Sequence, residues 1–462
     1  MTRVSSRSPV YSPPFLDVIS IGFGPANIAL AVAFEELTKD LHVQFLEKRS
    51  APGWQEGMLL EDSDIQNHPL RDLVTPRNPR SRYTFTNFLF ENDRLFEHLN
   101  LGLAYPLRIE YEQYVRWVAG FFAHQVQYGV EVSAIEPVIG RGTNVPEGYV
   151  VRDKSGREWH ARSVVVAPGR TPNVPVVFNG LDSERIVHLC DYLFALDRVR
   201  QRKRNPRIAV VGGSQSAVEI LLHAHDLGVC EKVVGITRNF GIRQKDTSPF
   251  SDEVYFPQFV QTFYFGNDKT KQRLRAELEP TNYSSADKDV VDALYVKLYA
   301  ERILRRNTLA VYRNTEVESV NADERGIHLG LHETITGGRT SESFDLVVLA
   351  TGFLDIGPGA KREPYPGLLN GISSLLDLGR GYLKVSIDYR VQLAGQSEHA
   401  APIYLNGLCE SSHGMGDSGS FSLLSLRSAA IVQSLAEQLA RTPSRNTRAQ
   451  DPDHDLVSGA AG

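Results

Sequence analysis

Two glycine-containing turns constrain this chain more than any other feature of its sequence. The first lies in DVISIGFGPANIALAVAFEE at 17–36, and the second lies in IAVVGGSQSAVEILLHAHDLG at 208–228. In each, a β-branched run precedes the glycines and a run with helical spacing of apolar residues follows them. Each segment predicts a strand, a tight turn and a helix, the unit that places a dinucleotide pyrophosphate at a helix N-terminus. With 462 residues, the chain is long enough for two such domains.

The first turn has most of the dinucleotide fingerprint. Gly22 permits a tight turn, Gly24 lets the backbone approach a pyrophosphate, and Asn27 replaces the third glycine. A strand predicted at 41–46 ends in Glu47, near the position at which an acid binds a ribose hydroxyl. A glycine string alone also fits an ordinary strand-to-helix turn, but the added Glu47 favours a dinucleotide, which we predict to be FAD.

The second turn differs from the first at its end. Gly212 opens the turn, Ser214 replaces the middle glycine, and Gln215 and Ser216 begin the helix. The next predicted strand, 232–236, is followed by Arg238, where the first unit has Glu47. A guanidinium binds a 2′-phosphate that an acid would repel. The second unit therefore predicts NADPH binding, although a solvated arginine is the alternative for Arg238.

Two further hydrophobic runs end in small residues, SVVVAPG at 163–169 and DLVVLATGF at 345–353. We expect both to be strands beside the first unit that carry the chain between domains. The predicted fold is α/β, with two Rossmann-like dinucleotide-binding domains and a small substrate-binding region. The expected boundaries are 12–204 for the first part of the FAD domain, 205–308 for the NADPH domain, 309–442 for the second part of the FAD domain with the substrate-binding region, and 1–11 and 443–462 for disordered tails.

Composition excludes several classes of protein. The formal net charge of -5 gives no reason to expect nucleic acid or an anionic membrane as a partner. The apolar stretch at 17–34 contains Gly22, Gly24 and Pro25, so it is not expected to span a membrane. Cysteine occurs only at Cys190, Cys230 and Cys409, without CxxC or zinc spacing, so we expect no disulfide redox centre, no metal site and a cytoplasmic location.

Several longer motifs, in order, resemble the flavin-dependent N-hydroxylating monooxygenases. This family includes the ornithine and lysine N-hydroxylases of siderophore biosynthesis, and the resemblance covers about residues 15–440. The motifs that carry it are DVISIGFGPANIALA, Trp54 with GML at 57–59, RDLVTPRNPRSRYTFTNFL at 71–89, PLRIEYEQYVRWVA at 106–119, DTSPFSDEVYFP at 246–257, TNYS at 281–284, ATGF at 350–353 and NGLCESSHGMGDSGSFSLLS at 406–425.

The resemblance implies a reaction and its cofactors. The family uses FAD, NADPH and O2 to hydroxylate a side-chain amine through a C4a-hydroperoxyflavin, which must be kept dry while NADP+ remains bound. The amine must reach the site unprotonated, and desolvation disfavours its ammonium form. Members of the family are commonly homotetramers or dimers, but no segment of this sequence identifies an interface.

The resemblance also assigns roles to individual residues. Gln66 is expected beside the isoalloxazine with Trp54 in the FAD site, and Asn282 is expected to contact both the nicotinamide and the substrate amine. Gln66 and Asn282 are thus the expected catalytic residues. Tyr283 is expected to stack on adenine, with core packing as the alternative. Ser425 is expected to line the substrate site, although residues 416–421 suggest a longer loop than usual.

Two departures from the family pattern bear on the substrate. Arg71 stands where the ornithine enzymes have a lysine that binds the substrate carboxylate, and Asp252 stands where they have an asparagine. Arginine can still bind a carboxylate, with two hydrogen bonds. Asp252 could hold an α-ammonium, be neutralised by Arg71, or recognise the far end of a diamine. L-Ornithine is the favoured substrate, and lysine, a diamine or another amino acid are the alternatives.

Two other classes of protein are alternatives for this sequence. FNG at 178–180, with His188 and Tyr192, loosely resembles the fingerprint of flavin monooxygenases that oxidise sulfur or ketones. Seven residues separate Gly180 from His188 where that fingerprint has three, which favours an N-hydroxylase. A second alternative is a non-catalytic dinucleotide-binding sensor, which would have no use for a substrate pocket.

The C-terminal region carries two smaller predictions. The run from Ser422 to about Arg441 has apolar residues at helical spacing and is expected to pack on the FAD domain. His413 could act as a catalytic base, but a structural role is favoured because flavin hydroxylation needs little beyond deprotonation of the amine.

Overall fold

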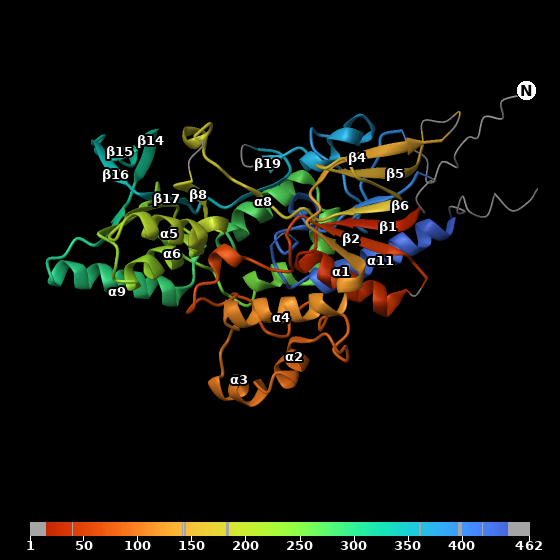
Figure 1. Ribbon diagram of the computed structural model, residues 1–462, viewed down its shortest axis with the longest axis horizontal. Coiled ribbons are helices and arrows are strands. Elements are labelled where there is room, and N and C mark those ends of the chain that lie inside the picture. The colour runs from red at the N-terminus through yellow and green to blue at the C-terminus, as the bar shows by residue number, and fades with distance from the viewer. Residues whose placement is uncertain are drawn as a thin grey trace, which may run out of the picture.

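The computed structural model describes residues 15–38, 40–140, 142, 145–181, 184–359, 362–395, 400–417 and 419–441. The predicted disordered tails at 1–11 and 443–462 lie outside these ranges, as does residue 12, the expected start of the first domain. Figure 1 shows two bodies side by side along the longest axis of the molecule.

Helices and strands alternate along the chain in the manner of an α/β protein, which confirms the predicted fold class. The helices are α1 Pro25–Leu37, α2 Phe85–Glu91, α3 Leu95–Leu101, α4 Arg108–Phe121, α5 Tyr192–Arg202, α6 Gln215–Asp226, α7 Pro257–Phe265, α8 Asp268–Leu278, α9 Lys288–Ile303, α10 Glu410–His413 and α11 Leu424–Arg441. The strands are β1 Leu16–Ile21, β2 Val43–Glu47, β3 Val126–Tyr128, β4 Val132–Ile139, β5 Pro146–Asp153, β6 Glu158–Val166, β7 Thr171–Pro172, β8 Ile186–His188, β9 Arg207–Val211, β10 Lys232–Ile236, β11 Arg243–Gln244, β12 Ser285–Ala286, β13 Leu309–Tyr312, β14 Thr315–Ala322, β15 Ile327–Glu333, β16 Arg339–Phe344, β17 Leu346–Leu349, β18 Phe353–Ile356, β19 Arg362–Glu363 and β20 Ile403–Leu405.

The first unit is built on a seven-stranded sheet in the order β3-β2-β1-β6-β5-β4, with β20 pairing with β6. The strands β1, β2, β3, β6 and β20 pair in parallel, whereas β4, β5 and β6 pair antiparallel. Helices α1 and α11 lie together against this sheet (Figure 1). The prediction that the C-terminal helix packs on this unit is confirmed, because Ile431 and Leu435 are buried in its core.

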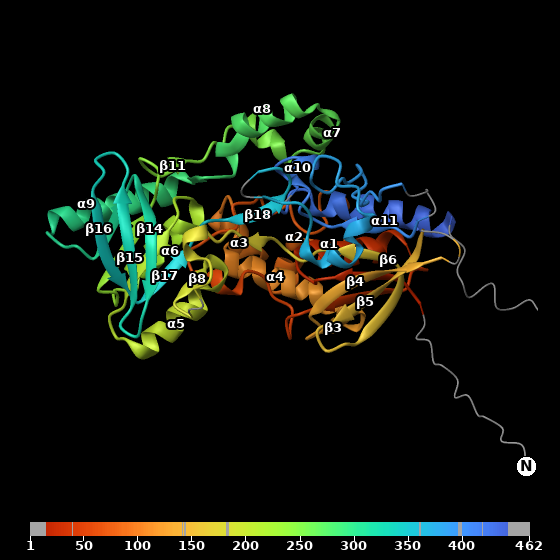
Figure 2. The same cartoon turned by 90° about the horizontal axis from the view of Figure 1, so that it is seen from above.

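The second unit is built on a five-stranded parallel sheet in the order β13-β10-β9-β17-β8. Helices α5, α6 and α9 pack on one face of this sheet, in a core that includes Val210 and Val348. The antiparallel sheet of β14, β15 and β16 packs on the other face, where Leu329 and Phe344 meet Ala209. Figure 2 shows this layered arrangement from above.

Both glycine turns make the same close contact. Gly22 has φ +87°, its N–H donates to the Leu46 carbonyl at 2.8 Å, and a Cβ on it would lie 2.3 Å from the Ala167 carbonyl oxygen. Gly212 has φ +151°, and a Cβ on it would lie 2.3 Å from the Ala350 carbonyl oxygen. Only glycine fits at either position. The alanines of the APG and ATG segments are thus the residues against which the two turns close.

The structure corrects the expected position of residues 345–353. The segment was expected beside the first unit, yet β17 pairs with β9 of the second unit. Strand β1 is already paired on both sides, by β2 and β6, so it offers no free edge. The expected boundaries at 205 and 308 are corrected with it, since the second sheet begins at β8 and ends at β17.

Two short strands connect the units. Strand β7, which leaves the first unit, pairs antiparallel with β18, which returns to it, through Phe353 and Leu354. The two segments that cross between the units therefore lie side by side and are hydrogen-bonded to each other.

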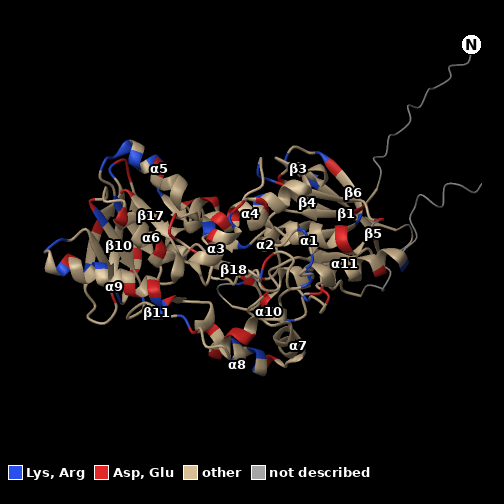
Figure 3. Ribbon diagram, turned by 90° about the horizontal axis from the view of Figure 1, so that it is seen from below, with Lys and Arg blue, Asp and Glu red and all other residues tan. Residues whose placement is uncertain are grey.

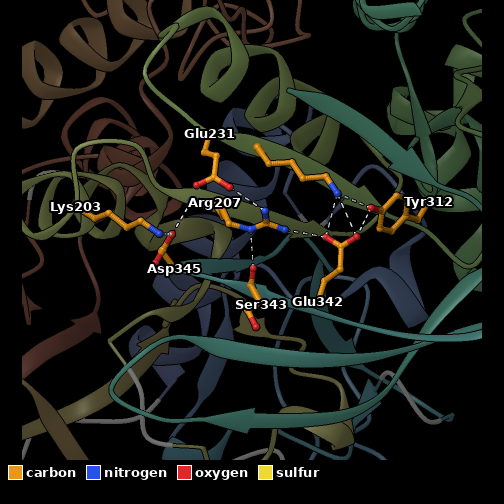
Figure 4. Close-up of polar contacts among 8 residues, drawn as sticks. Lys203, Arg207, Glu231, Tyr312, Glu342, Ser343 and Asp345 are labelled. Carbon is orange, nitrogen blue, oxygen red and sulfur yellow. Dashed lines mark hydrogen bonds and ion pairs between the residues drawn. The ribbon is translucent and has the colours of Figure 1, made fainter. Parts of the chain in front are cut away.

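An ionic network fastens the two sheets of the second unit together (Figure 4). The Arg207 guanidinium pairs with Glu231 at 3.0 Å and with Glu342 at 3.2 Å, and its backbone N–H donates to Asp345 at 2.7 Å. Glu342 also accepts from Lys232 at 3.1 Å. These contacts tie β9 and β10 to β16 at the ends of the strands away from the glycine turn.

The segment between β10 and α9 leaves the second unit and reaches the first. It carries α7 and α8, and Figure 2 shows both helices over the first unit. Tyr264 donates its hydroxyl to the Val385 carbonyl at 3.1 Å, and α7 packs against α10. This excursion brings Asp252 and Asn282, which lie within the predicted 205–308 domain, next to residues of the first unit.

His413 is part of the packing in this region. It is fully buried, stacks on Tyr389 with ring centroids 4.2 Å apart, and hydrogen-bonds Ser412 at 2.8 Å. Burial lowers the pKa of its imidazole. These contacts favour the structural role over the catalytic one.

The glycine contacts predict a sharp contrast between two glycines of the same turn. Gly22→Ala forces a Cβ into the Ala167 carbonyl at a strained φ and is expected to destabilise the protein by at least about 1–3 kcal/mol. Gly24→Ala places its Cβ in open space, with φ -82°, and is expected to leave the free energy of unfolding unchanged within about 1 kcal/mol. Urea unfolding of the two variants measures the difference. Equal stabilities would contradict the close-contact argument.

Candidate functional site

A cavity of about 1150 Å³ lies between the two units and is lined by both. It collects most of the residues predicted from the sequence, although they are spread over more than two hundred positions. The predicted residues that line it are Trp54, Gln66, Arg71, Gly212, Ser214, Gln215, Ser216, Arg238, Asp252, Asn282 and Tyr283.

The remaining predicted residues lie elsewhere. Gly22, Gly24 and Asn27 belong to the first turn and the start of α1, and Glu47, at the end of β2, accepts from the Phe23 N–H of that turn. Ser425 is buried in the first turn of α11 rather than among the residues lining the cavity. Ser422 lines the cavity instead, where its hydroxyl donates to Asn67 at 3.1 Å. Because Ser422 lines the cavity and Ser425 does not, Ser422 is the better candidate for contact with a ligand.

Both glycine turns leave helix N-termini open to an anion. Neither Gly24 at the start of α1 nor Ser214 at the start of α6 caps its helix with a side chain. The first N–H groups of each helix are therefore available, and the helix dipole is positive there. A Cβ on Gly24 would meet no atom within 4 Å, so the backbone can be approached closely. The arrangement fits two pyrophosphates, one at each turn.

Glu47 and Asn27 stabilise the first turn. One Glu47 carboxylate oxygen accepts from the Phe23 N–H at 2.6 Å, and the other accepts from the Arg49 N–H at 2.9 Å. A carboxylate has further lone pairs that could accept from a ribose. The Asn27 side chain donates to the Gly22 carbonyl at 2.6 Å and accepts from Asn406 at 3.0 Å. These hydrogen bonds engage the Asn27 side chain within the protein. The contact of Asn27 with FAD stays a prediction.

Gln66 joins the first unit to the second. Its backbone has φ +52°, and its side-chain amide donates to Asp287, which directly precedes α9. The Asp287 N–H donates to Gln215 at 2.8 Å, and Gln215 donates to Glu219 at 3.0 Å. Glu219 is paired with the buried Arg108 at 2.9 Å. A continuous chain of hydrogen bonds thus links Gln66 to the turn of the second unit.

Two carboxyl groups, those of Asp64 and Asp287, are in contact with Gln66. Burial, with the nearby charges of Asp287 and Glu219, raises the pKa of the Asp64 carboxyl from 3.8 to about 6, although the Gln66 N–H donates to it. Burial also raises the pKa of Asp287, opposed by Lys245 at 3.8 Å. Ionised carboxylates are unfavourable here because they repel one another in a poorly solvated region.

Arg71 and Asp252 lie around two tyrosines at one end of the cavity. The Arg71 guanidinium lies 6.0 Å from the centre of the Tyr255 ring. Burial raises the pKa of Tyr255, with Asp252 adding to the rise and Arg71 opposing it. The charges of Asp252 and Arg71 act in the same directions on Tyr105, whose pKa burial also raises. Within the described part of the chain, neither Arg71 nor Asp252 forms an ion pair with another side chain.

Tyr283 belongs to an ionic cluster in the wall of the cavity. Its hydroxyl donates to Glu410, which pairs with Arg362 at 3.0 Å. Arg170 lies 6.0 Å from the centre of the Tyr283 ring and pairs with Asp355 at 2.9 Å. The predicted stacking on adenine is untested, and these contacts favour the alternative of packing within the protein.

Arg238 and Asn282 are two polar residues that line the cavity. Arg238 follows β10, is exposed and lines the cavity beside the second turn, and it forms no ion pair with any described residue. Asn282 follows the short 3-10 helix Glu279–Thr281 and also lines the cavity. Both positions suit contact with a ligand.

Sequence reasoning missed several residues of the site. Arg108 lies in a motif that carried the resemblance, but its partner Glu219 is 111 residues away. Asp287 is likewise 221 residues from Gln66. Tyr105 directly precedes the motif at 106–119 and Tyr255 lies within the motif at 246–257, but neither stands out there. Arg108 and Asp287 are identified only by their position near the cavity in the folded chain. One signal was present in the sequence: Glu219 lies among apolar residues of a predicted helix, and a buried carboxylate needs a partner.

The fold and cavity define a protein with two dinucleotide-binding units that share one reaction cavity. The family described as L-lysine 6-monooxygenase/L-ornithine 5-monooxygenase matches residues 14–355. The L-ornithine N(5)-monooxygenase of Burkholderia cepacia is 37% identical over 86% of this chain and 89% of its own.

Two solved structures extend the comparison. The ornithine hydroxylase PvdA from Pseudomonas aeruginosa is 34% identical, with a TM-score of 0.83 over 92% of this chain and 100% of its own. The ornithine N-hydroxylase KtzI from Kutzneria sp. 744, titled with reduced FAD, NADP+ and L-ornithine, is 30% identical, with a TM-score of 0.82 over the same shares. The chain belongs to the L-lysine 6-monooxygenase/L-ornithine 5-monooxygenase family, and it is a flavin-dependent N-hydroxylating monooxygenase.

The carboxyl cluster predicts a pH-dependent effect of Asp64→Asn. Because the pKa of Asp64 is raised from 3.8 to about 6, its ionisation destabilises the folded protein increasingly from about pH 4 to pH 6. The stabilisation by Asp64→Asn is expected to grow by on the order of 2 kcal/mol between pH 4 and pH 7, and then to remain constant. Urea unfolding at several pH values measures it.

The exposed neighbour Asp62 provides the control, since Asp62→Asn removes a charge two residues away. Its effect is expected to be small at every pH. A constant effect of Asp64→Asn across the range would contradict the buried carboxyl cluster.

Proposed function

We propose that this protein hydroxylates the side-chain amine of an α-amino acid, with L-ornithine as the first candidate and its N5 as the reacting atom. The product would supply hydroxamate groups for a siderophore or a related natural product. The family, the shared cavity and the placement of Gln66 and Asn282 support the reaction type. Family membership alone leaves the amine open.

The observation that carries the substrate class is the presence of one cationic residue, Arg71, and one anionic residue, Asp252, around the same two tyrosines of the cavity. An α-amino acid presents a carboxylate and an ammonium at one end, so it matches one cationic and one anionic group. Neither group is engaged in an ion pair within the described residues. A simple diamine would leave Arg71 without a partner in the cavity, which would cost free energy. Arg71 is the proposed partner of the carboxylate, and Asp252 that of the α-ammonium.

The two turns are the proposed cofactor sites. FAD would lie at the first turn, on the N-terminus of α1 with Gly22, Gly24 and Glu47, and would extend to Trp54 and Gln66 in the cavity. NADPH would lie at the second turn with Gly212 and Ser214. Arg238 would bind its 2′-phosphate, since this exposed guanidinium has no described ion-pair partner. FAD, when bound, would accept hydride from NADPH and activate O2.

The reaction balances with these components. NADPH provides two electrons and one proton is taken up, one oxygen atom of O2 becomes the hydroxyl on the amine nitrogen, and the other leaves as water. The substrate nitrogen must be neutral to use its lone pair. Enclosure between the two units disfavours the charged form of an amine that has no carboxylate partner, as the reacting nitrogen would be. Asn282 would orient the nitrogen through a hydrogen bond.

L-Lysine and diamines remain second candidates. The matched family includes lysine 6-monooxygenases, and a lysine side chain is one methylene longer than that of ornithine. One methylene changes discrimination by about 1–3 kcal/mol, so both amino acids could react at different rates.

A cytoplasmic location and a homodimeric or homotetrameric assembly complete the proposal. No described helix has the length and apolar character to cross a bilayer.

A panel of amines tests the proposal. The purified protein is incubated with FAD, NADPH and O2 and with L-ornithine, L-lysine, putrescine or cadaverine, and hydroxylamine is measured rather than NADPH loss. Hydroxylation is expected to be fastest with an amino acid. Exclusive reaction with a diamine would overturn the carboxylate assignment, and sulfoxidation without hydroxylamine would overturn the reaction type.

Substitutions at the two charged positions refine the same test. Arg71→Ala is expected to raise the KM for the amino acid about 10- to 100-fold, because it removes a charge-assisted hydrogen-bonding group. Flavin reduction by NADPH without substrate should change little. Arg71→Lys keeps the charge and serves as the matched control, and Asp252→Asn keeps the shape while removing the negative charge. An unchanged KM in both Arg71→Ala and Asp252→Asn would contradict the proposed head-group site.

A further inference from the structure

Helix α9 carries an apolar stripe that faces away from the molecule. It lies at the outer edge of the second unit, far from α11 (Figures 1 and 2). From its outer face we propose that two copies of the chain pair through α9, antiparallel and centred on Tyr299. The inference does not depend on the substrate or the reaction.

The inner and outer faces of α9 are clearly separated. Leu294 is buried against α6, and Val290 and Leu298 pack around the same core. On the other side, the exposed fractions are 64% for Tyr295, 64% for Val296, 57% for Tyr299, 62% for Ile303 and 54% for Leu304. Single exposed apolar residues are normal, but these recur every three or four residues and form one continuous stripe.

A continuous stripe of this kind points to a partner. At roughly 100 Å² for each of five half-exposed large side chains, the stripe offers about 500 Å² per copy, near the largest apolar patch of a typical monomer. Pairing two such stripes would bury about 1,000 Å², the lower end of a specific interface. Charged residues around the stripe would add to that area.

The charges around the stripe indicate a second copy in antiparallel orientation. Asp289 and Asp292 lie near the start of α9 with Lys288, which pairs with Asp292, and Arg302, Arg305 and Arg306 lie at or just after its end. The start of α9 is therefore net negative and its end net positive. Figure 3 shows basic residues at the outer end of α9. Asp292 precedes Tyr299 by seven residues on α9, and Arg306 follows it by seven, in the segment just after the helix ends at Ile303.

A two-fold axis at Tyr299 therefore places the acidic end of each helix beside the basic end of the other. A parallel pair would place like charges together. Two-fold self-pairing of one patch is also the commonest form of soluble homo-oligomer. The self-complementary charge pattern thus favours a second copy of this chain over an unrelated partner.

Sedimentation velocity of the flavin-loaded protein tests the pairing. The wild type is expected to sediment with a mass of two 51.5 kDa chains or a multiple of that pair. Tyr299→Glu places two like charges at the centre of the interface and is expected to halve the mass. Flavin content and thermal unfolding should stay at wild-type values, which shows that the variant is folded.

Helix α3 provides the matched control, because it also exposes large apolar side chains, including Phe96 at 85%. Phe96→Glu is expected to leave the mass unchanged. A monomeric wild type, an unchanged mass in Tyr299→Glu, or dissociation by Phe96→Glu instead would each overturn the proposal.

Charge reversal tests the register separately. Asp292→Arg or Arg306→Asp alone is expected to weaken the dimer about tenfold or more, because each creates two like-charge contacts. The double variant Asp292→Arg/Arg306→Asp restores opposite charges in both contacts and is expected to recover most of the affinity. Additive weakening in the double variant would overturn the antiparallel register.

Discussion

The structure depends on the contact between each glycine turn and the alanine carbonyl of the neighbouring strand. A Cβ on Gly22 would lie 2.3 Å from the Ala167 carbonyl oxygen, and a Cβ on Gly212 would lie 2.3 Å from that of Ala350. Each contact fixes the direction in which the following helix begins. Because the helix N-termini carry uncapped N–H groups, the contacts also fix where two anionic dinucleotides can lie. The cavity between the units follows from this repeated geometry.

The substrate end of the cavity depends on a different feature. The chain leaves the second unit after β10, packs α7 on the first unit and returns at α9. Asp252 and Asn282 lie on this excursion, so a segment of one unit completes a site in the other. The hydrogen-bond chain from Gln66 through Asp287 to Gln215 crosses between the units in the same region. The relative position of the two units thus bears on both the redox and the substrate parts of the site.

Local sequence was sufficient for features that depend on neighbouring residues. The two strand-turn-helix units could be predicted because glycine spacing and hydrophobic period act over a few positions. The motif resemblance added residues that the cavity then brought together, including Arg71 and Asp252. The sheet to which 345–353 belongs could not be predicted locally, because a buried parallel strand has the same continuous hydrophobic sequence in either sheet. The partners Glu219 and Asp287 lie 111 and 221 residues along the chain from Arg108 and Gln66. Local sequence also did not show that Ser422, rather than Ser425, lines the cavity.

The central claim is that each turn binds its own dinucleotide and that both dinucleotides reach one cavity. Anaerobic reduction of the bound flavin by NADPH and by NADH, in the wild type and in Arg238→Ala, tests this most directly. The account predicts that Arg238→Ala weakens NADPH binding by about tenfold or more, changes NADH little and leaves the flavin content intact. Loss of flavin in this variant, or an unchanged preference for NADPH, would contradict it.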